Sequence, residues 1–286
     1  MFSGPNPPDA AVITYYQKKR HIFGKMKIEV LDSQGKLVDT LPPNSRRGVS
    51  RVEWAMRLKP PRVPPAATAA FEATQGPRVV PGTYSVKMTR GAETYTTQLV
   101  VQQDPRAKFT PADRQLEFDA AMRVYNFLGD MSFDADRISA MHDALLDRAA
   151  KIKNDAPLAK KLQQTADSMD ELRKKIVSTK EGGAVTGEIR IREKTTELYG
   201  DILNYEGRPT DYQSARIDSL KKELADVSTQ FDAFASKELP AINKLLAQKK
   251  IEAIHPVARP AWDAANSDEG TGGGAPSGGF VRLLWK

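Results

Sequence analysis

Two short basic clusters are the residues of this sequence best suited to chemistry. Lysine and arginine side chains beside aromatic rings can hold the anionic groups of nucleic acids and glycans. Charges at strand ends can instead protect a sheet edge from pairing with another chain, and both interpretations stay open at this point. The candidate polyanion contacts are Lys18, Lys19, Arg20, Arg46 and Arg47, with Tyr15, Tyr16 and Phe23 flanking the first cluster.

Metal-binding patterns are missing from the sequence. His21, His142 and His255 lie in different segments and share no ligand spacing. Three aspartates crowd together, but they lack the Asn/Asp repeat, the glycine and the later glutamate of a calcium loop. We therefore expect no metal site and interpret these carboxylates as part of a solvated helix face. The aspartates are Asp130, Asp134 and Asp136.

No recognisable catalytic constellation is present either. The chain has no cysteine, which excludes disulfides, thiolate zinc sites and cysteine nucleophiles. The glycine-rich residues 270–279 lack the Gly-Lys-Ser/Thr ending of a phosphate loop and are typical of a flexible linker. We predict no catalytic residue and no cofactor. An enzyme with paired carboxylates remains an alternative, because such a pair needs only proximity in space.

The net charge is concentrated in the first part of the chain. Residues 1–105 carry 15 Lys and Arg against 8 Asp and Glu, whereas residues 106–286 carry 28 of each. The whole formal excess of +7 therefore lies before residue 106. A basic domain attracts anionic partners such as acidic polysaccharide, nucleic acid or a membrane surface. We consider an acidic glycan as the partner and predict no specific recognition of nucleic acid.

Alternation of apolar and polar residues predicts antiparallel strands between residues 9 and 103. Trp54 lies between Val52 and Met56 on one apolar face, so we expect it to anchor a core. The proline-rich residues 60–81 predict a long loop. Six or seven short strands with turns between them predict an Ig-like β-sandwich. The other apolar faces are Met26, Ile28 and Val30; Tyr84, Val86 and Met88; and Tyr95, Thr97, Leu99 and Val101.

Helical periodicity begins after the strand region. Thr110 and Pro111 predict a helix start, with a hydroxyl N-cap and proline at the first helical position. This helix should run to about residue 154. A capping box at Thr210 should open the last helix, and Pro240 should kink or restart it.

The lengths and spacings of the helices favour a bundle. Shorter helices are expected over residues 156–180 and 188–204, and the apolar residues of the last helix step by three and four as in a coiled coil. The simplest packing is a long three-helix antiparallel bundle with a broken middle helix; four separate helices are the alternative. The predicted fold class is α+β and multidomain. The seam residues are Ile217, Leu220, Leu224, Val227, Phe231 and Phe234.

These patterns divide the chain into three parts. We predict a sandwich over residues 6–105, a helical bundle over 106–251 and a flexible glycine-rich tail over 252–286. Residues 280–285 of the tail are apolar enough to dock as a terminal strand. No apolar run approaches the roughly 20 residues that span a bilayer. The first residues have neither a basic nor an apolar signal region, so we expect no signal peptide in this chain.

Several stretches resemble the C-terminal region of large bacterial sortilin-type, BNR-repeat β-propeller proteins of the glycosyl-hydrolase-like kind. The resemblance covers roughly residues 6–250, and the sandwich also resembles the Ig-like domain of flagellar hook-capping proteins. The matching stretches are residues 6–16, Gly48 with Arg51-Val52-Glu53-Trp54 and Arg57, Pro81-Gly82-Thr83-Tyr84 with Gly91 and Tyr95, Asp104-Pro105-Arg106, Leu198-Tyr199-Gly200 and Gly207-Arg208-Pro209-Thr210.

The resemblance implies a role without catalysis. Proteins of this family carry propellers ahead of the matching region, and any hydrolase site would lie in those propellers. No propeller box occurs here, so no catalytic residue is carried over. We expect an extracytoplasmic (periplasmic or secreted) accessory module, and its partners would be β-propeller domains of the same parent protein or of another protein.

Overall fold

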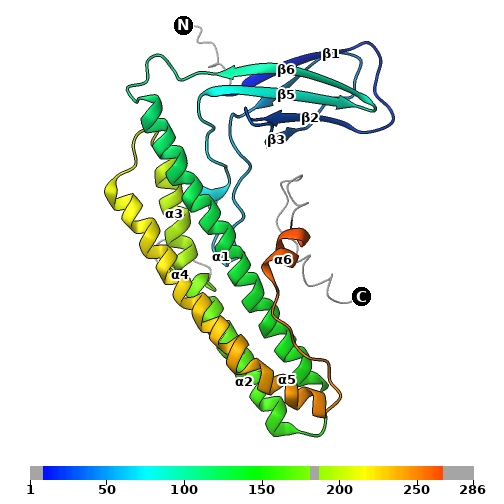
Figure 1. Cartoon of the computed structure of the whole chain (residues 1–286), viewed down its shortest axis with the longest axis vertical. Helices are drawn as coiled ribbons and strands as arrows, with labels where there is room; N and C mark the ends of the chain where they lie inside the picture. Colours follow the sequence, from blue (N-terminus) through cyan, green and yellow to red (C-terminus); the bar gives the residue numbers. More distant parts are fainter. Residues whose placement is uncertain (1–8, 181–186, 267–286) are drawn as a thin grey trace. The chain divides into compact units, whose positions relative to one another are not determined.

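The structure is a computed structural model that describes residues 9–180 and 187–266 (Figure 1). It is a mixed α and β protein with two small antiparallel sheets and several helices. The predicted α+β class is confirmed. The strands are β1 (Ala11–Gln17), β2 (Met26–Leu31), β3 (Leu37–Leu41), β4 (Gly48–Trp54), β5 (Gly82–Arg90) and β6 (Glu93–Val101).

The chain folds into two compact units that interleave along the sequence. The sheet unit comprises the chain up to Pro60, Gln75–Met122 and Ile202–Pro209, as far as these residues are described. The helical unit comprises Pro61–Thr74, Arg123–Asp201 and the described residues from Thr210 onward. The separate domain limits predicted from the sequence stay a prediction.

Two antiparallel sheets make up the strand part of the sheet unit. Strands β1 and β4 pair with each other, and the second sheet has the order β3-β2-β5-β6. Apolar residues of both sheets join one hydrophobic cluster, in which Trp54 is fully buried. The Trp54 ring meets the Tyr84 ring edge-on at 5.3 Å. The prediction that Trp54 anchors a core is confirmed. The buried cluster is Ile28, Val30, Leu41, Trp54, Val79, Tyr84 and Val86.

Strand β6 differs from its prediction. Alternation placed Tyr95 and Thr97 on a buried face with Leu99 and Val101, but Tyr95 is 56% exposed and Thr97 is exposed as well. Only Leu99 and Val101 pack against the cluster. The physical reason is the unequal size of the sheets: a two-stranded sheet cannot cover the whole inner face of a four-stranded one, and β6 lies at the edge.

The helices begin and end close to their predicted limits. Thr110 accepts a hydrogen bond from the Asp113 amide at the start of α1, and a complete capping box at Thr210 starts α4. Pro240 lies at the beginning of α5, where the chain restarts its helix as predicted. The helices are α1 (Pro111–Lys151), α2 (Ala156–Ile176), α3 (Ile191–Leu203), α4 (Asp211–Lys237), α5 (Leu239–Gln248) and α6 (Arg259–Ala265), with a short 3₁₀ helix over Phe71–Ala73.

Polar contacts fix the directions of the helices in the helical unit. Arg123 and Arg137 of α1 bind Asp218 and Asp232 of α4, at 2.6 and 2.7 Å. From the first pair to the second, the residue number rises in α1 and also in α4, so the two helices run in the same direction. Lys175 of α2 contacts Gln230 of α4, and Lys194 of α3 contacts Glu223 of α4. The residue number rises from α2 to α3 while that of the α4 partner falls, so the chain through α2 and α3 runs antiparallel to α4, as Figure 1 shows.

The apolar seam predicted for the last helix is confirmed, since all six of its residues are buried. The region after residue 252 differs from its prediction, because α6 forms there and buries Trp262. The predicted linker over residues 270–279 and the docking strand over residues 280–285 lie outside the described residues.

Candidate functional site

The pairing of β1 with β4 brings the two basic clusters to one place. Gln17 lies opposite Gly48 in this antiparallel pair, so the segment that follows β1 and the segment that precedes β4 leave the same end of the sheet. We call this surface the basic end. It consists of Lys18, Lys19, Arg20, Arg46 and Arg47.

A buried glutamine holds the two segments together. The Gln17 side chain is almost fully buried, and its amide nitrogen donates to the carbonyl oxygens of Asn44 at 2.6 Å and Arg46 at 3.0 Å. The backbone amide of His21 also donates to the carbonyl of Ser45 at 2.9 Å. Sequence reasoning missed Gln17, although a polar residue on the inward face of an alternating strand is a signal for such a link.

Among the residues that the structure describes, the five cations of the basic end have no anionic partner. All five are exposed, and within residues 9–180 and 187–266 none of them forms an ion pair. The adjoining β5–β6 turn carries Glu93, but the Glu93 carboxylate already accepts from Arg90 and from the Tyr95 hydroxyl. The backbone therefore gathers like charges, and none of the carboxylates in the described part of the chain pairs with them.

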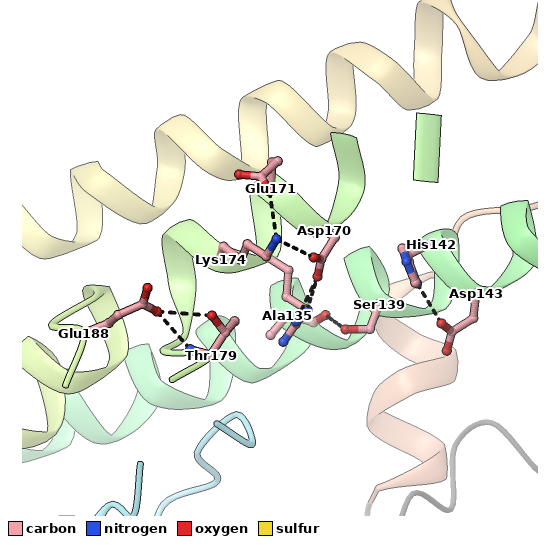
Figure 2. Close-up of polar contacts among 10 residues, drawn as sticks. Ala135, Ser139, His142, Asp143, Asp170, Glu171, Lys174, Thr179 and Glu188 are labelled. Atoms are coloured by element: carbon pink, nitrogen blue, oxygen red, sulfur yellow. Dashed lines mark hydrogen bonds and ion pairs between the residues drawn. The ribbon is translucent and has the colours of Figure 1, made fainter. Parts of the chain in front are cut away.

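The helical unit contains several local ion pairs between neighbouring side chains. In Figure 2, Lys174 on α2 lies between Asp170 and Glu171, at 2.8 Å from each carboxylate. Hydrogen bonds to Asp170 and Glu171 raise the pKa of the Lys174 ammonium group above its ordinary value. Glu188 accepts from the amide and hydroxyl of Thr179. Many charges on this unit are paired locally, although exposed lysines such as Lys160 and Lys221 form no ion pair among the described residues.

His21 belongs to the sheet unit, whereas His142 and His255 belong to the helical unit. His21 contacts the carbonyl of Gly24 at 3.1 Å, His142 contacts Asp143 at 2.8 Å, and His255 is exposed. In the described part of the chain, no group of three or more His, Asp or Glu residues is placed to hold a metal ion. No helix among those residues is long and apolar enough to cross a bilayer.

The interpretation of the three aspartates as a solvated face is wrong for Asp134. Its side chain is 9% exposed, 2.8 Å from Arg137, and it accepts a hydrogen bond from Ser228 of α4. Burial raises the pKa of Asp134, against the opposing effect of these two partners. Asp130 binds Arg259 and Asp136 accepts from the Trp262 indole, each at 2.8 Å. Helix α1 has neighbours on several sides, so these carboxylates act as links to α4 and α6.

Comparison with known proteins adds no relative. No protein family, curated protein or solved structure matches this chain. The resemblance to BNR-repeat propeller proteins therefore stays a prediction.

One carboxylate outside the basic end has a strongly shifted pKa. Burial raises the pKa of Glu117 in α1 to about 7, although its ion pair with Arg114 opposes the shift. A group that titrates near neutrality suits acid–base catalysis. However, the Glu117 and Arg114 side chains are only 4% and 6% exposed and bind each other. We interpret the pair as structural.

An apolar cleft of about 130 Å³ opens between β1 and β6. It exists because β6 extends beyond the cover of the two-stranded sheet, as the exposure of Tyr95 shows. No charged residue contributes to its lining, so it offers no group that could orient a polar substrate. Its lining residues are Ile13, Thr14, Tyr15, Ile28, Val86, Met88, Tyr95, Thr96 and Thr97.

Proposed function

We propose that this chain is a non-catalytic interaction module that binds a polyanionic partner at its basic end. The observation that carries the proposal is the β1–β4 register, which gathers from two separate segments five exposed cations that form no ion pair within the described residues. Neighbouring like charges repel and so oppose folding. An anionic partner relieves that repulsion, which favours a binding role over mere protection of a sheet edge.

The architecture supports a binding role that rests on a rigid scaffold. We propose that the sheet unit is an Ig-like β-sandwich, because both sheets contribute to one hydrophobic cluster around Trp54. We propose that the helical unit is a three-helix bundle with a broken middle helix. The shared direction of α1 and α4, opposite to α2 and α3, supports this up-down-up arrangement.

The sequence resemblance supports a wider proposal about the parent protein. The chain would be the accessory C-terminal part of a secreted or periplasmic BNR-repeat propeller protein, and any hydrolase site would lie in the propellers. Turnover of sialosides or other glycosides by this chain, abolished by changing a single carboxylate, would overturn the non-catalytic part of the proposal.

A salt titration on a heparin column tests the binding role. The full chain should be retained, and a variant with glutamine at Lys18, Lys19, Arg20, Arg46 and Arg47 should elute at much lower salt, because screening and counterion release act on such contacts. A matched control loses five exposed lysines of the helical unit and should elute close to the wild type. Equal shifts in both variants would show that only net charge matters. The control positions are Lys160, Lys161, Lys221, Lys222 and Lys237.

A further inference from the structure

The loop between β1 and β2 presents two apolar side chains to solvent beside the basic end. Ile22 is 68% exposed and Phe23 is 85% exposed. They follow Lys18, Lys19 and Arg20 after one intervening residue, His21, and Lys25 comes two residues after Phe23. An exposed isoleucine alone is ordinary, but an exposed apolar pair next to a cluster of exposed cations calls for an explanation.

Hydrogen bonds hold the loop in its shape. The His21 amide donates to Ser45 on one side, and on the other side the Gly91 amide donates to the Lys25 carbonyl at 2.8 Å. Between them, a ring nitrogen of His21 contacts the Gly24 carbonyl, and Gly24 takes the left-handed conformation with φ 86°. The loop is therefore fixed at both ends, while the side chains of Ile22 and Phe23 stay outside the hydrophobic cluster.

The outer face of the β1–β4 sheet carries two further exposed apolar side chains. Tyr16 and Val49 lie opposite each other in the register, and their exposed fractions are 66% and 68%. Tyr16 precedes the first basic cluster by two residues, and Val49 follows the second by two. Exposed apolar side chains thus occur next to both basic clusters, on β1, on β4 and in the β1–β2 loop.

We infer that the basic end docks on an anionic lipid surface, with Ile22 and Phe23 entering the boundary between headgroups and acyl chains. The inference rests on the proposed function and names its polyanion. Cations attract the negative surface of a bilayer, and long lysine and arginine side chains can reach the phosphates while neighbouring apolar groups are buried. Apolar insertion adds to this attraction, because neither contribution alone anchors a protein firmly.

The chemistry of the loop favours a lipid surface over a soluble polyanion. An aromatic ring such as Phe23 can stack on a sugar or a base, but the branched aliphatic side chain of Ile22 has no such use. A hydrocarbon boundary accepts both side chains. Glycan or nucleic-acid binding would depend on the cations and would tolerate polar residues at the two apolar positions.

Vesicle sedimentation with the full chain tests the inference. Vesicles of phosphatidylcholine alone are compared with vesicles of equal parts phosphatidylcholine and phosphatidylglycerol. We expect salt-sensitive binding to the anionic vesicles only. The double variant Ile22→Ser, Phe23→Ser should bind them about tenfold or more weakly, yet elute from heparin as the wild type does. Phe71→Ser, at a 76% exposed phenylalanine of the helical unit, is the matched control and should bind normally.

The outcomes separate the inference from the proposed function. Heparin binding without vesicle binding, or vesicle binding that the double variant retains in full, would overturn the lipid inference and leave the polyanion role standing. Loss of both heparin and vesicle binding in the wild type would overturn both. Because Ile22 and Phe23 are exposed, the double variant should keep the wild-type circular dichroism spectrum and melting temperature, so a loss of binding reports on the surface.

Discussion

Glu117 and Arg114 are single residues whose environment sets a measurable property of the sheet unit. They form a buried ion pair one helical turn apart in α1. Removing a carboxylate from water disfavours its charged form, and here this effect exceeds the stabilisation by Arg114. The folded protein therefore holds a proton on Glu117 at pH values where the unfolded chain has released it.

The pH dependence of stability should report this proton. The ordinary pKa of the Glu117 carboxyl is 4.5 and the folded value is about 7. Between these values the folded state binds more protons than the unfolded state. The stabilisation of the folded state by protonated Glu117 is therefore complete below pH 4.5. It is lost as the pH rises through 7, and the unfolding free energy falls by about 3 kcal/mol in total.

Urea unfolding at several pH values measures this loss. The variant Glu117→Gln should lack the decline that the wild type shows between acid and neutral pH. The control Glu53→Gln removes an exposed carboxylate of β4 and should keep the wild-type slope. If wild type and Glu117→Gln decline in parallel, the carboxylate titrates at an ordinary pKa in the folded protein.

At the scale of elements, the proline-rich segment Pro61–Thr74 is tied to α3. The Arg192 side chain is 5% exposed, and its guanidinium donates to the Pro64 carbonyl at 2.8 Å and to the Thr68 hydroxyl at 3.1 Å. Glu193 accepts from both Arg192 and Thr68. The Arg192 guanidinium is thus one of the contacts that hold this loop, together with the hydrogen bonds from the Ala67 amide to the Ser178 carbonyl and from Arg62 to the Asn266 carbonyl.

Replacing Arg192 should loosen the segment. Arg192→Lys keeps the charge but cannot make both hydrogen bonds, so we expect a loss of roughly 1–3 kcal/mol in unfolding free energy. Limited proteolysis should also cut earlier within Pro61–Thr74. Arg47→Lys, at an exposed and unpaired position, is the control and should leave both measurements unchanged. An unchanged cutting rate in Arg192→Lys would show that other contacts hold the segment.

Elements with a strong local signal could be predicted from the sequence, and elements that depend on distant partners could not. The apolar seam of α4 and the capping box at Thr210 follow from short-range spacing. Helix α6 has only seven residues, and its place depends on contacts of Trp262 and Arg259 with α1. The buried state of Asp134 depends in the same way on Ser228 and Arg137.

The candidate site was predictable only in part for the same reason. The residue types and the two clusters are visible in the sequence, but their meeting requires the register that places Gln17 opposite Gly48. Alternation identifies β1 and β4 as strands without stating which strand pairs with which. The exposure of Ile22 and Phe23 likewise depends on how the loop is held by Ser45 and Gly91.

At the scale of the whole molecule, each compact unit contains chain from the other side of the predicted boundary. The sheet unit includes Ile202–Pro209, where Glu206 lies 3.6 Å from Arg78 and Tyr205 meets Phe109 edge-on. The helical unit includes Pro61–Thr74. A cut near residue 105 therefore leaves both fragments incomplete.

Fragments cut near residue 105 should fold separately but with lower stability than the full chain. We expect residues 1–105 to give a β-type circular dichroism spectrum and residues 106–251 to give a strongly helical one. Both should melt at a lower temperature than the full chain, because each lacks a segment of its own unit. A spectrum of mixed type from either fragment would contradict the boundary, and full-length stability in both would show that the exchanged segments contribute nothing.

The return of Ile202–Pro209 to the sheet unit also affects how the protein is made. The last strand, β6, is complete at Val101, but the final segment of that unit is synthesised about a hundred residues later. At a translation rate of about 5–20 residues per second, the newly synthesised strands remain without Ile202–Pro209 for roughly 5–20 seconds. During that interval Arg78 lacks Glu206 and Phe109 lacks the Tyr205 ring. The nascent chain is therefore exposed to chaperones and proteases for longer than the strand order alone would suggest.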